Sequence, residues 1–332
     1  MASISALTPC RVAMEACASS HRWGRWFAAR GHTARLIPAE FVKPFRLSGK
    51  NDAADAEAIA AAARQRTMRF VAIKSVEQQT ILAWHSVRAG WHEERTALLN
   101  RTCGLLAEFD VVIARSADRI LGALPTLIED PRLPDPMRAM LLEVREQLAA
   151  LNLRLARCDR QIATPARSSD VARRASELLG VGPVTSSALA ATVPDASIFR
   201  NGRQFGAWLG LTPRQHSSGG RTRLGHISLR GNVYLRTLLV QGARSTLQSA
   251  LRADPTHASR LQRWIRQLHD RKGYPREATE SAWASGRRLA LIQFALARSF
   301  RNLNREHLRS VFEVRRRIPG AGLNCQEEFP LF

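Results

Sequence analysis

Two serines stand in a segment whose composition suits chemistry on a phosphate backbone. Ser217 and Ser218 are followed directly by Gly219 and Gly220, and glycines let another backbone approach closely. Four arginines flank this pair: Arg214, Arg221, Arg223 and Arg230. Because guanidinium groups suit phosphate, a serine hydroxyl among them is a candidate nucleophile and the arginines are candidate DNA-binding residues.

A free serine hydroxyl is a weak nucleophile and needs a base, a metal or neighbouring cations to activate it. His216 and His226 lie close in the sequence, although phosphate contact or simple exposure explains histidines beside a basic loop equally well. Ser-Ser-Gly-Gly is also an ordinary flexible turn by composition. The sequence leaves both interpretations of this segment open.

Three carboxylates form a second group with chemical potential. Glu15 ends a short apolar run, and Asp52 and Asp55 are three residues apart, on one face of an alanine-rich segment. Carboxylates hold Mg²⁺ in phosphoryl-transfer enzymes. The alternative is that the two aspartates stabilise the positive N-terminus of their helix without any metal.

Gly180 and Gly182 make a tight Gly-Val-Gly hairpin between two expected helices, the second of which starts at Pro183. Such a hairpin presents backbone N–H groups at a helix N-terminus, where a DNA phosphate binds well. A helical turn that needs glycine for packing is an equally good explanation.

The elements that must position these residues follow from the hydrophobic pattern. Residues 11–16 and 33–37 read as strands with a helix between them, which predicts a parallel pair with Glu15 at its carboxyl edge. Residues 50–64 predict a strong helix. Further helices are expected over 76–109, from 183, over 199–209 and over 233–251, while the segment between the last two is expected to be a loop.

A heptad seam runs through residues 137–162, with apolar residues alternately four and three positions apart. This spacing favours a coiled coil and a homodimer or higher oligomer through the seam. A helical hairpin that packs the same seam inside one chain is the alternative. Pro134 and Pro136 before it, and Pro165 after it, are expected to mark its ends.

Composition limits the partners. The chain has 332 residues and a formal net charge of +22, which favours a polyanion such as DNA. No apolar run is long enough to span a bilayer, so we expect no membrane partner and a cytoplasmic location. Five scattered cysteines without a C-x-x-C pair argue against a zinc site.

Several ordered motifs together resemble the DEDD transposases of the one-ten insertion-sequence family, especially their eleven-eleven subgroup. They are VAMEA at 12–16, SHRWG at 20–24, LIP at 36–38, VKP at 42–44, KNDAADAEAI at 50–59, GVGP at 180–183, FGAWLGLTPRQHSSGG at 205–220, and the segment 224–236. The resemblance covers about residues 10–290.

The resemblance implies a fold class and four segments. An α/β remnant of a RuvC-like, ribonuclease-H-type domain occupies 1–70, a long-helix and coiled-coil segment 71–170, and a mostly α-helical serine transposase domain with a helix-hairpin-helix-like motif 171–290. A divergent tail follows over 291–332. The implied activity is DNA strand exchange through a covalent serine intermediate, guided by a structured RNA from the element.

The resemblance also implies residue roles. Ser218, in the Ser-Gly motif, matches the nucleophile and is preferred over Ser217. Glu15, Asp52 and Asp55 match three of the four acids that bind Mg²⁺ or Mn²⁺. The first aspartate of the family has no counterpart before Glu15, which suggests a truncated reading frame that lacks its first strand and is inactive. A non-catalytic nucleic-acid-binding remnant, and a nuclease that uses only the carboxylates, are the competing functions.

Overall fold

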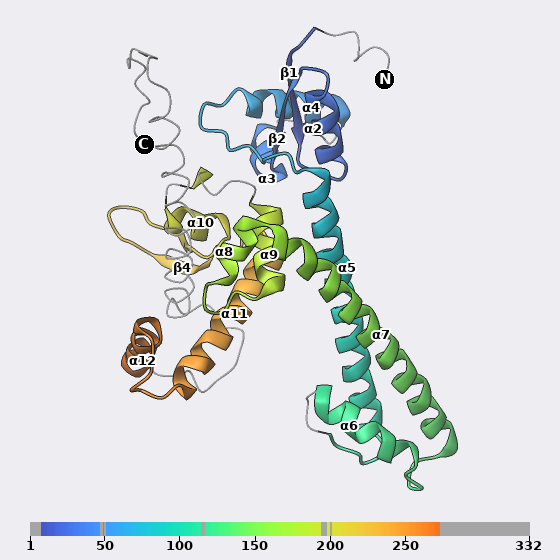
Figure 1. The fold of residues 1–332 in the computed structure, drawn as a ribbon. Coiled ribbons are helices and arrows are strands. Elements are labelled where there is room, and N and C mark those ends of the chain that lie inside the picture. The colour runs from blue at the N-terminus through green and yellow to red at the C-terminus, as the bar shows by residue number, and fades with distance from the viewer. Residues whose placement is uncertain are drawn as a thin grey trace. The chain divides into compact units, whose positions relative to one another are not determined.

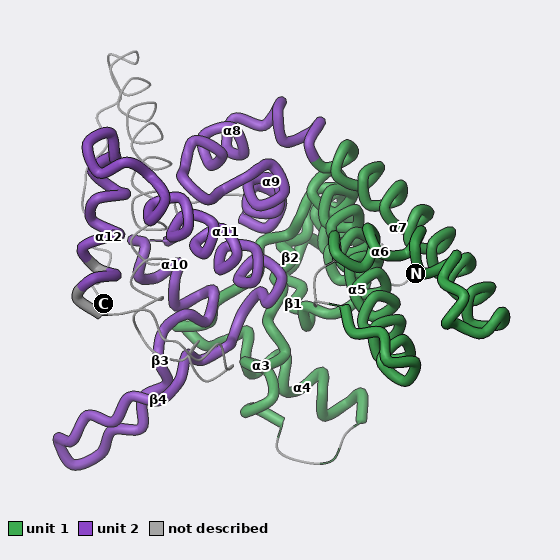
Figure 2. The backbone as a smooth tube through the Cα atoms, turned by 90° about the horizontal axis from the view of Figure 1, so that it is seen from below, with its two compact units in different colours: residues 1–162 green, residues 163–332 purple. Residues whose placement is uncertain are grey.

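A computed structural model of the protein describes residues 8–46, 49, 51–113, 117–193, 198–199 and 201–272. The chain divides into two compact units, residues 1–162 and 163–332 (Figure 2). Figure 1 draws the helices and strands of both units along the chain. The expected tail over 291–332 lies outside the described residues, as does the part of the expected transposase domain from 273 to 290.

Unit 1 begins with a strand-helix-strand element. Strands β1 (Arg11–Glu15) and β2 (Thr33–Ile37) pair in parallel, with Glu15 opposite Ile37, and helix α2 (Ser20–Ala28) connects them. Helix α2 packs on both strands (Figure 1). The expected parallel pair is confirmed, and Glu15 ends β1 at the carboxyl edge of the sheet.

Helix α4 (Asp52–Ala63) packs on the same two strands through its alanines. It follows α3 (Ala39–Val42) and the 3-10 helix η1 (Lys43–Phe45). Ala58 and Ala62 are buried against Ile37, and Ala13 packs on the same cluster. Because alternate residues of a strand share a face, Glu15 lies on the face of β1 that also carries Ala13, toward α4.

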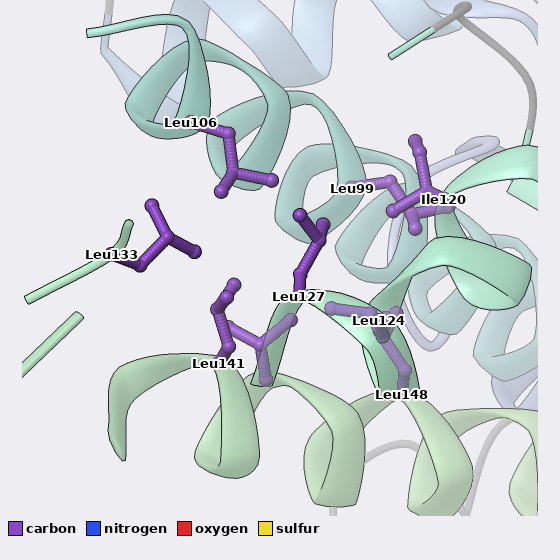
Figure 3. Close-up of a cluster of buried hydrophobic side chains, with 9 residues drawn as sticks. Leu99, Leu106, Ile120, Leu124, Leu127, Leu133, Leu141 and Leu148 are labelled. Carbon is purple, nitrogen blue, oxygen red and sulfur yellow. The ribbon is translucent and has the colours of Figure 1, made fainter. Parts of the chain in front are cut away.

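Three further helices follow: α5 (Val76–Ala107), α6 (Ala117–Ile128) and α7 (Asp135–Ser168), of which α7 belongs to unit 1 as far as Ile162. Helices α5 and α7 run antiparallel, since Arg88 contacts Asp159 and Arg95 contacts Asn152. Figure 3 shows the buried cluster between the three helices, in which Leu141 and Leu148 of α7 face residues of α5 and α6.

This packing corrects the prediction that the heptad seam over 137–162 is a contact between two chains. All of its positions after the partly buried Met137 are buried within the single chain: Leu141, Val144, Leu148, Leu151, Leu155, Cys158 and Ile162. A heptad repeat predicts an apolar stripe but not the partner that covers it. Here α5 and α6 of the same chain supply that partner, which is the helical-hairpin alternative.

The prediction that Pro165 marks the end of the seam helix is wrong by three residues. Helix α7 continues to Ser168 with Pro165 inside it. The Pro165 carbonyl accepts a hydrogen bond from the Ser169 amide at 3.1 Å. A proline this close to the C-terminus removes one amide donor from a helix that is almost complete, so the helix tolerates it for one more turn.

Unit 2 consists of short helices around a small core and one hairpin. Its elements are α8 (Asp170–Ser176), α9 (Pro183–Thr192), α10 (Gly202–Trp208), β3 (Pro213–Gln215), β4 (Leu224–Ile227), α11 (Val233–Arg252) and α12 (Arg260–Lys272). The core gathers Phe205 of α10 and Leu209, which caps that helix, with Leu235 and Leu239 of α11. In the described residues, no helix is long and apolar enough to cross a membrane.

Gly180 and Gly242 bring the turn before α9 into direct backbone contact with α11. A Cβ on Gly242 would lie 2.0 Å from the Gly180 carbonyl oxygen, and Gly180 has φ +88°. A Cβ on Gly182 would meet no atom within 4 Å. Packing therefore explains the glycine at 180, while Gly182 caps α9 with its surface open.

We expect Gly242→Ala to destabilise unit 2 by about 3 kcal/mol or more, because the added methyl group meets backbone that can move only with its element. Gly182→Ala is the control and should cost less than about 1 kcal/mol, the loss of a glycine cap. Urea unfolding of the full chain measures both. Equal midpoints for the two variants would contradict the close contact.

The buried His85 of α5 leads to a second prediction, which concerns how the stability of the protein depends on pH. It is 1% exposed, and burial, followed by the charge of Arg88, lowers the pKa of His85 to about 4. The unfolded chain therefore binds this proton first as the pH falls, so the stability that neutral His85 provides is lost between about pH 6.5 and pH 4.

We expect His85→Gln to reduce the loss of unfolding free energy between pH 7 and pH 4 by up to about 3 kcal/mol relative to wild type. Denaturant unfolding at a series of pH values checks this difference. His257→Gln, at an 87% exposed side chain, should keep the wild-type pH dependence. An unchanged slope in His85→Gln would show that His85 titrates normally in the folded protein.

Candidate active site: a serine hairpin and a carboxylate face

The segment that was expected to be a loop is an antiparallel hairpin. Strand β3 pairs with β4, with Pro213 opposite Ile227 and Gln215 opposite Leu224. Gly219 and Gly220 both have positive φ, 57° and 73°, as the two central residues of a type I′ turn require. The glycine pair therefore turns the chain directly after Ser218, and it was the one signal from which the hairpin could have been predicted.

Two further glycines close the base of this serine hairpin, residues 210–231. A Cβ on Gly210 would lie 2.0 Å from the Arg230 carbonyl oxygen, and one on Gly231 would lie 2.0 Å from that of Trp208. Both have positive φ. The Leu229 amide donates to the Gly210 carbonyl at 3.1 Å, so only glycine fits at these two crossing points.

A buried arginine holds the same base, and sequence reasoning missed it. Arg236 of α11 is 8% exposed, and its Nη1 donates to the carbonyls of Leu209 at 2.8 Å and Arg230 at 3.0 Å. Burial lowers the pKa of Arg236, yet an arginine stays charged at any ordinary pH. The available signal was an arginine next to Leu235 and three residues before Leu239, on the inward face of an amphipathic helix.

The two serines have different roles in the hairpin. The Ser217 hydroxyl accepts hydrogen bonds from Gln215 Nε2 at 2.9 Å and from the Arg223 amide at 3.2 Å, so it holds the two strands together. Ser218 is exposed, and its carbonyl accepts from the Arg221 amide at 3.1 Å. No described residue hydrogen-bonds to the Ser218 hydroxyl.

The predicted DNA-binding arginines are all exposed on the serine hairpin. Arg214 Nη2 donates to the Ser228 carbonyl at 3.3 Å, across the hairpin. Arg221 and Arg223 follow the turn, and Arg230 sits at the base. The surface of the hairpin is thus basic, which suits contact with the phosphates of a nucleic-acid strand.

The carboxylates of unit 1 occupy neighbouring elements. Asp52 is exposed at the first residue of α4, and Asp55 is half-buried one turn later. The helix is capped by Asn51, whose side chain accepts from the Ala54 amide at 2.7 Å. Asp52 is therefore not needed as a cap, although both acids still favour the positive helix end.

These carboxylates do not form a closed metal site. Asp55 Oδ1 lies 3.4 Å from Arg46 Nη1, an ion pair at the surface. Within the part of the chain that the structure describes, no three His, Cys, Asp or Glu side chains gather as a metal would need. Glu15, Asp52 and Asp55 share the β1–α4 layer, but as they stand they do not fit a complete set of ligands.

Comparison with known proteins matches both units. The family model described as "Transposase IS116/IS110/IS902 family" matches residues 172–261, and a DEDD transposase model of IS110 type matches residues 2–110. A probable family 20 transposase of Pseudomonas aeruginosa is 46% identical over 269 residues, 80% of this chain and 78% of its own.

Other relatives agree. The transposase for insertion sequence element IS1111A of Coxiella burnetii is 38% identical over 267 residues, 80% of this chain and 72% of its own. That for element IS1328 of Yersinia enterocolitica is 35% identical over 257 residues, 77% and 75% of the two chains. With a DEDD domain in its first part and the second family domain across the serine hairpin, the chain belongs to the IS110/IS116/IS902 family of insertion-sequence transposases.

Proposed function

We propose that this protein exchanges DNA strands through a covalent intermediate on Ser218. The observation that carries the proposal is the contrast within the serine pair: Ser217 is engaged by Gln215 and Arg223, while the Ser218 hydroxyl is exposed and unengaged at the turn. A nucleophile must reach its substrate, and among the described residues of the hairpin Ser218 meets that condition.

The proposed step is a phosphoryl transfer. Ser218 Oγ attacks a DNA phosphorus, a bond forms between them, and the bond from phosphorus to one nucleoside oxygen breaks and leaves a free DNA hydroxyl. Attack by the hydroxyl of another strand then releases Ser218 and completes the exchange. Arg214, Arg221 and Arg223 are exposed on the same hairpin and would stabilise the charge that develops on the phosphate oxygens.

Membership of a DEDD family implies a divalent ion, Mg²⁺ or Mn²⁺, which when bound neutralises phosphate charge. We propose Glu15 and Asp52 as carboxylates that serve such an ion together with a further ligand. Asp55 would join them once its ion pair with Arg46 opens. That pair joins two partly exposed side chains and is worth little energy, so it is a weak obstacle.

DNA is the proposed substrate, and the net charge of +22 supports a polyanionic partner. A structured RNA of the element and a homo-oligomer complete the proposal, the oligomer forming through surfaces other than the buried seam of α7. The second candidate function is a non-catalytic nucleic-acid-binding protein. The lack of a gathered three-carboxylate set in the described residues favours that candidate, and the following experiments separate the two.

Ser218→Ala should abolish the covalent adduct between the full chain and DNA of the element ends, in the presence of Mg²⁺ and the element RNA. Denaturing electrophoresis of labelled DNA measures the adduct. Ser217→Ala is the matched control and should reduce the adduct without abolishing it, because it loosens the hairpin but keeps the nucleophile. An adduct that survives in Ser218→Ala would refute the assignment of the nucleophile.

Asp52→Asn should lower adduct formation by at least about 10-fold while DNA binding persists, because the amide keeps the shape and loses the charge that holds an ion. Glu57→Gln, an exposed change on the same helix, should leave the adduct unchanged. A wild-type chain that binds DNA, with a steep salt dependence, yet never forms an adduct would support the non-catalytic alternative.

Strand cleavage that depends on Asp52 but persists in Ser218→Ala would instead identify a nuclease that uses only its carboxylates.

A further inference from the structure

A lysine and a histidine that belong neither to the serine hairpin nor to the proposed carboxylate ligands contact each other near the start of α2. Lys74, in the segment before α5, donates its backbone N–H to His21 Nδ1 at 3.2 Å, and its Nζ lies 3.1 Å from His21 Nε2. Arg25 Nη1 holds the Lys74 carbonyl at 2.6 Å. The backbone around Lys74 is thus fixed on both sides by side chains of α2.

Counting hydrogens shows which form of the lysine this contact requires. A backbone N–H can only donate, so His21 Nδ1 must carry a lone pair and no proton. A neutral imidazole then has its proton on Nε2, which makes Nε2 a donor toward Lys74 Nζ. An ammonium group has three donors and no lone pair, so only the neutral amine of Lys74 can accept this hydrogen.

The surroundings agree with a neutral amine. Burial lowers the pKa of Lys74. Burial is also the largest cause that lowers the pKa of His21 to about 4, so this imidazole is neutral near pH 7 and its Nε2–H can donate. Glu77, at the start of α5, is exposed. Among the described residues, no carboxylate forms an ion pair with Lys74.

The choice of lysine is unusual in this chain. Lys and Arg together number 50, and the lysines are four: Lys43, Lys50, Lys74 and Lys272. An arginine cannot lose its proton in a protein, while a desolvated lysine can. A position that needs a neutral nitrogen with a lone pair therefore excludes the residue that the chain uses almost everywhere else.

We propose that Lys74 is a nucleophilic amine and the preferred acylation site of this protein, with acyl phosphates as its class of substrate. When the hydrogen bond from His21 Nε2 opens, the Nζ lone pair attacks the carbonyl carbon. A C–N bond forms, the C–O bond to phosphate breaks, and inorganic phosphate leaves while the nitrogen releases a proton to water. The amide that results has no available lone pair on nitrogen, so His21 Nε2 loses its acceptor and the tie between α2 and the segment before α5 weakens.

Treatment of the full chain with limiting acetyl phosphate at pH 8 tests the proposal, with peptide mass spectrometry to measure acetylation of each lysine. Lys74 should react several-fold to about 10-fold faster than the exposed Lys43, since the neutral fraction rises about 10-fold for each unit of lowered pKa. The preference should vanish in urea. Equal or slower reaction of Lys74 in the folded protein would overturn the proposal.

Two substitutions at His21 sharpen the test. His21→Gln keeps one acceptor and one donor and should preserve the preference for Lys74. His21→Glu places a carboxylate beside Nζ, stabilises the ammonium and should bring the rate at Lys74 down to that of Lys43 or below. His257→Glu makes the same change at an exposed site and should have no effect. A preference unchanged by His21→Glu would show that another group activates Lys74.

Discussion

The serine hairpin depends on one buried charge. Arg236 donates to the carbonyls of Leu209 and Arg230, one on each side of the hairpin base, and no apolar side chain could satisfy both acceptors. Gly210 and Gly231 let the two backbones cross at that point. A buried guanidinium costs desolvation energy, which these hydrogen bonds offset in part. These contacts fix the orientation of the serine hairpin at its base, although the hairpin itself has almost no buried residues.

Asp52 and Asp55 are positioned in a different way, because small side chains let their helix pack closely on the sheet. Ala58 and Ala62 let α4 lie against Ile37 and Val42 without larger groups between them. The helix is thus anchored by its later turns, while Asp52 and Asp55 are carried on its first turn, where solvent reaches them. The two proposed reactive groups therefore share a design: a buried anchor holds an exposed segment whose own residues contribute little to stability.

Elements with a buried face could be predicted from the sequence, and the others could not. The parallel strands, α4, α5 and α11 follow from apolar periodicity and caps, and the structure confirms them. Strands β3 and β4 are short and exposed, so no alternation marks them, and only Gly219 and Gly220 indicate a hairpin. The heptad seam of α7 predicts an apolar stripe but not which helices cover it. Ser218 and Ser217 differ only through hydrogen bonds, which no pattern of residue types reveals.

The side chains between α5 and α7 determine how the two helices align. Two of the contacts between these helices, Arg88 with Asp159 and Arg95 with Asn152, are seven residues apart on each helix. A hairpin slipped by one heptad would still place Arg95 beside Asp159, so these contacts alone discriminate poorly against misregistered folding. The apolar seam removes the ambiguity, because every second position along it is different: Met137, Val144, Leu151 and Cys158. Because the side chains along the seam differ in size, one alignment of the two helices packs better than the slipped ones. A seam of leucines alone would pack similarly in several alignments, and misaligned hairpins would then slow folding.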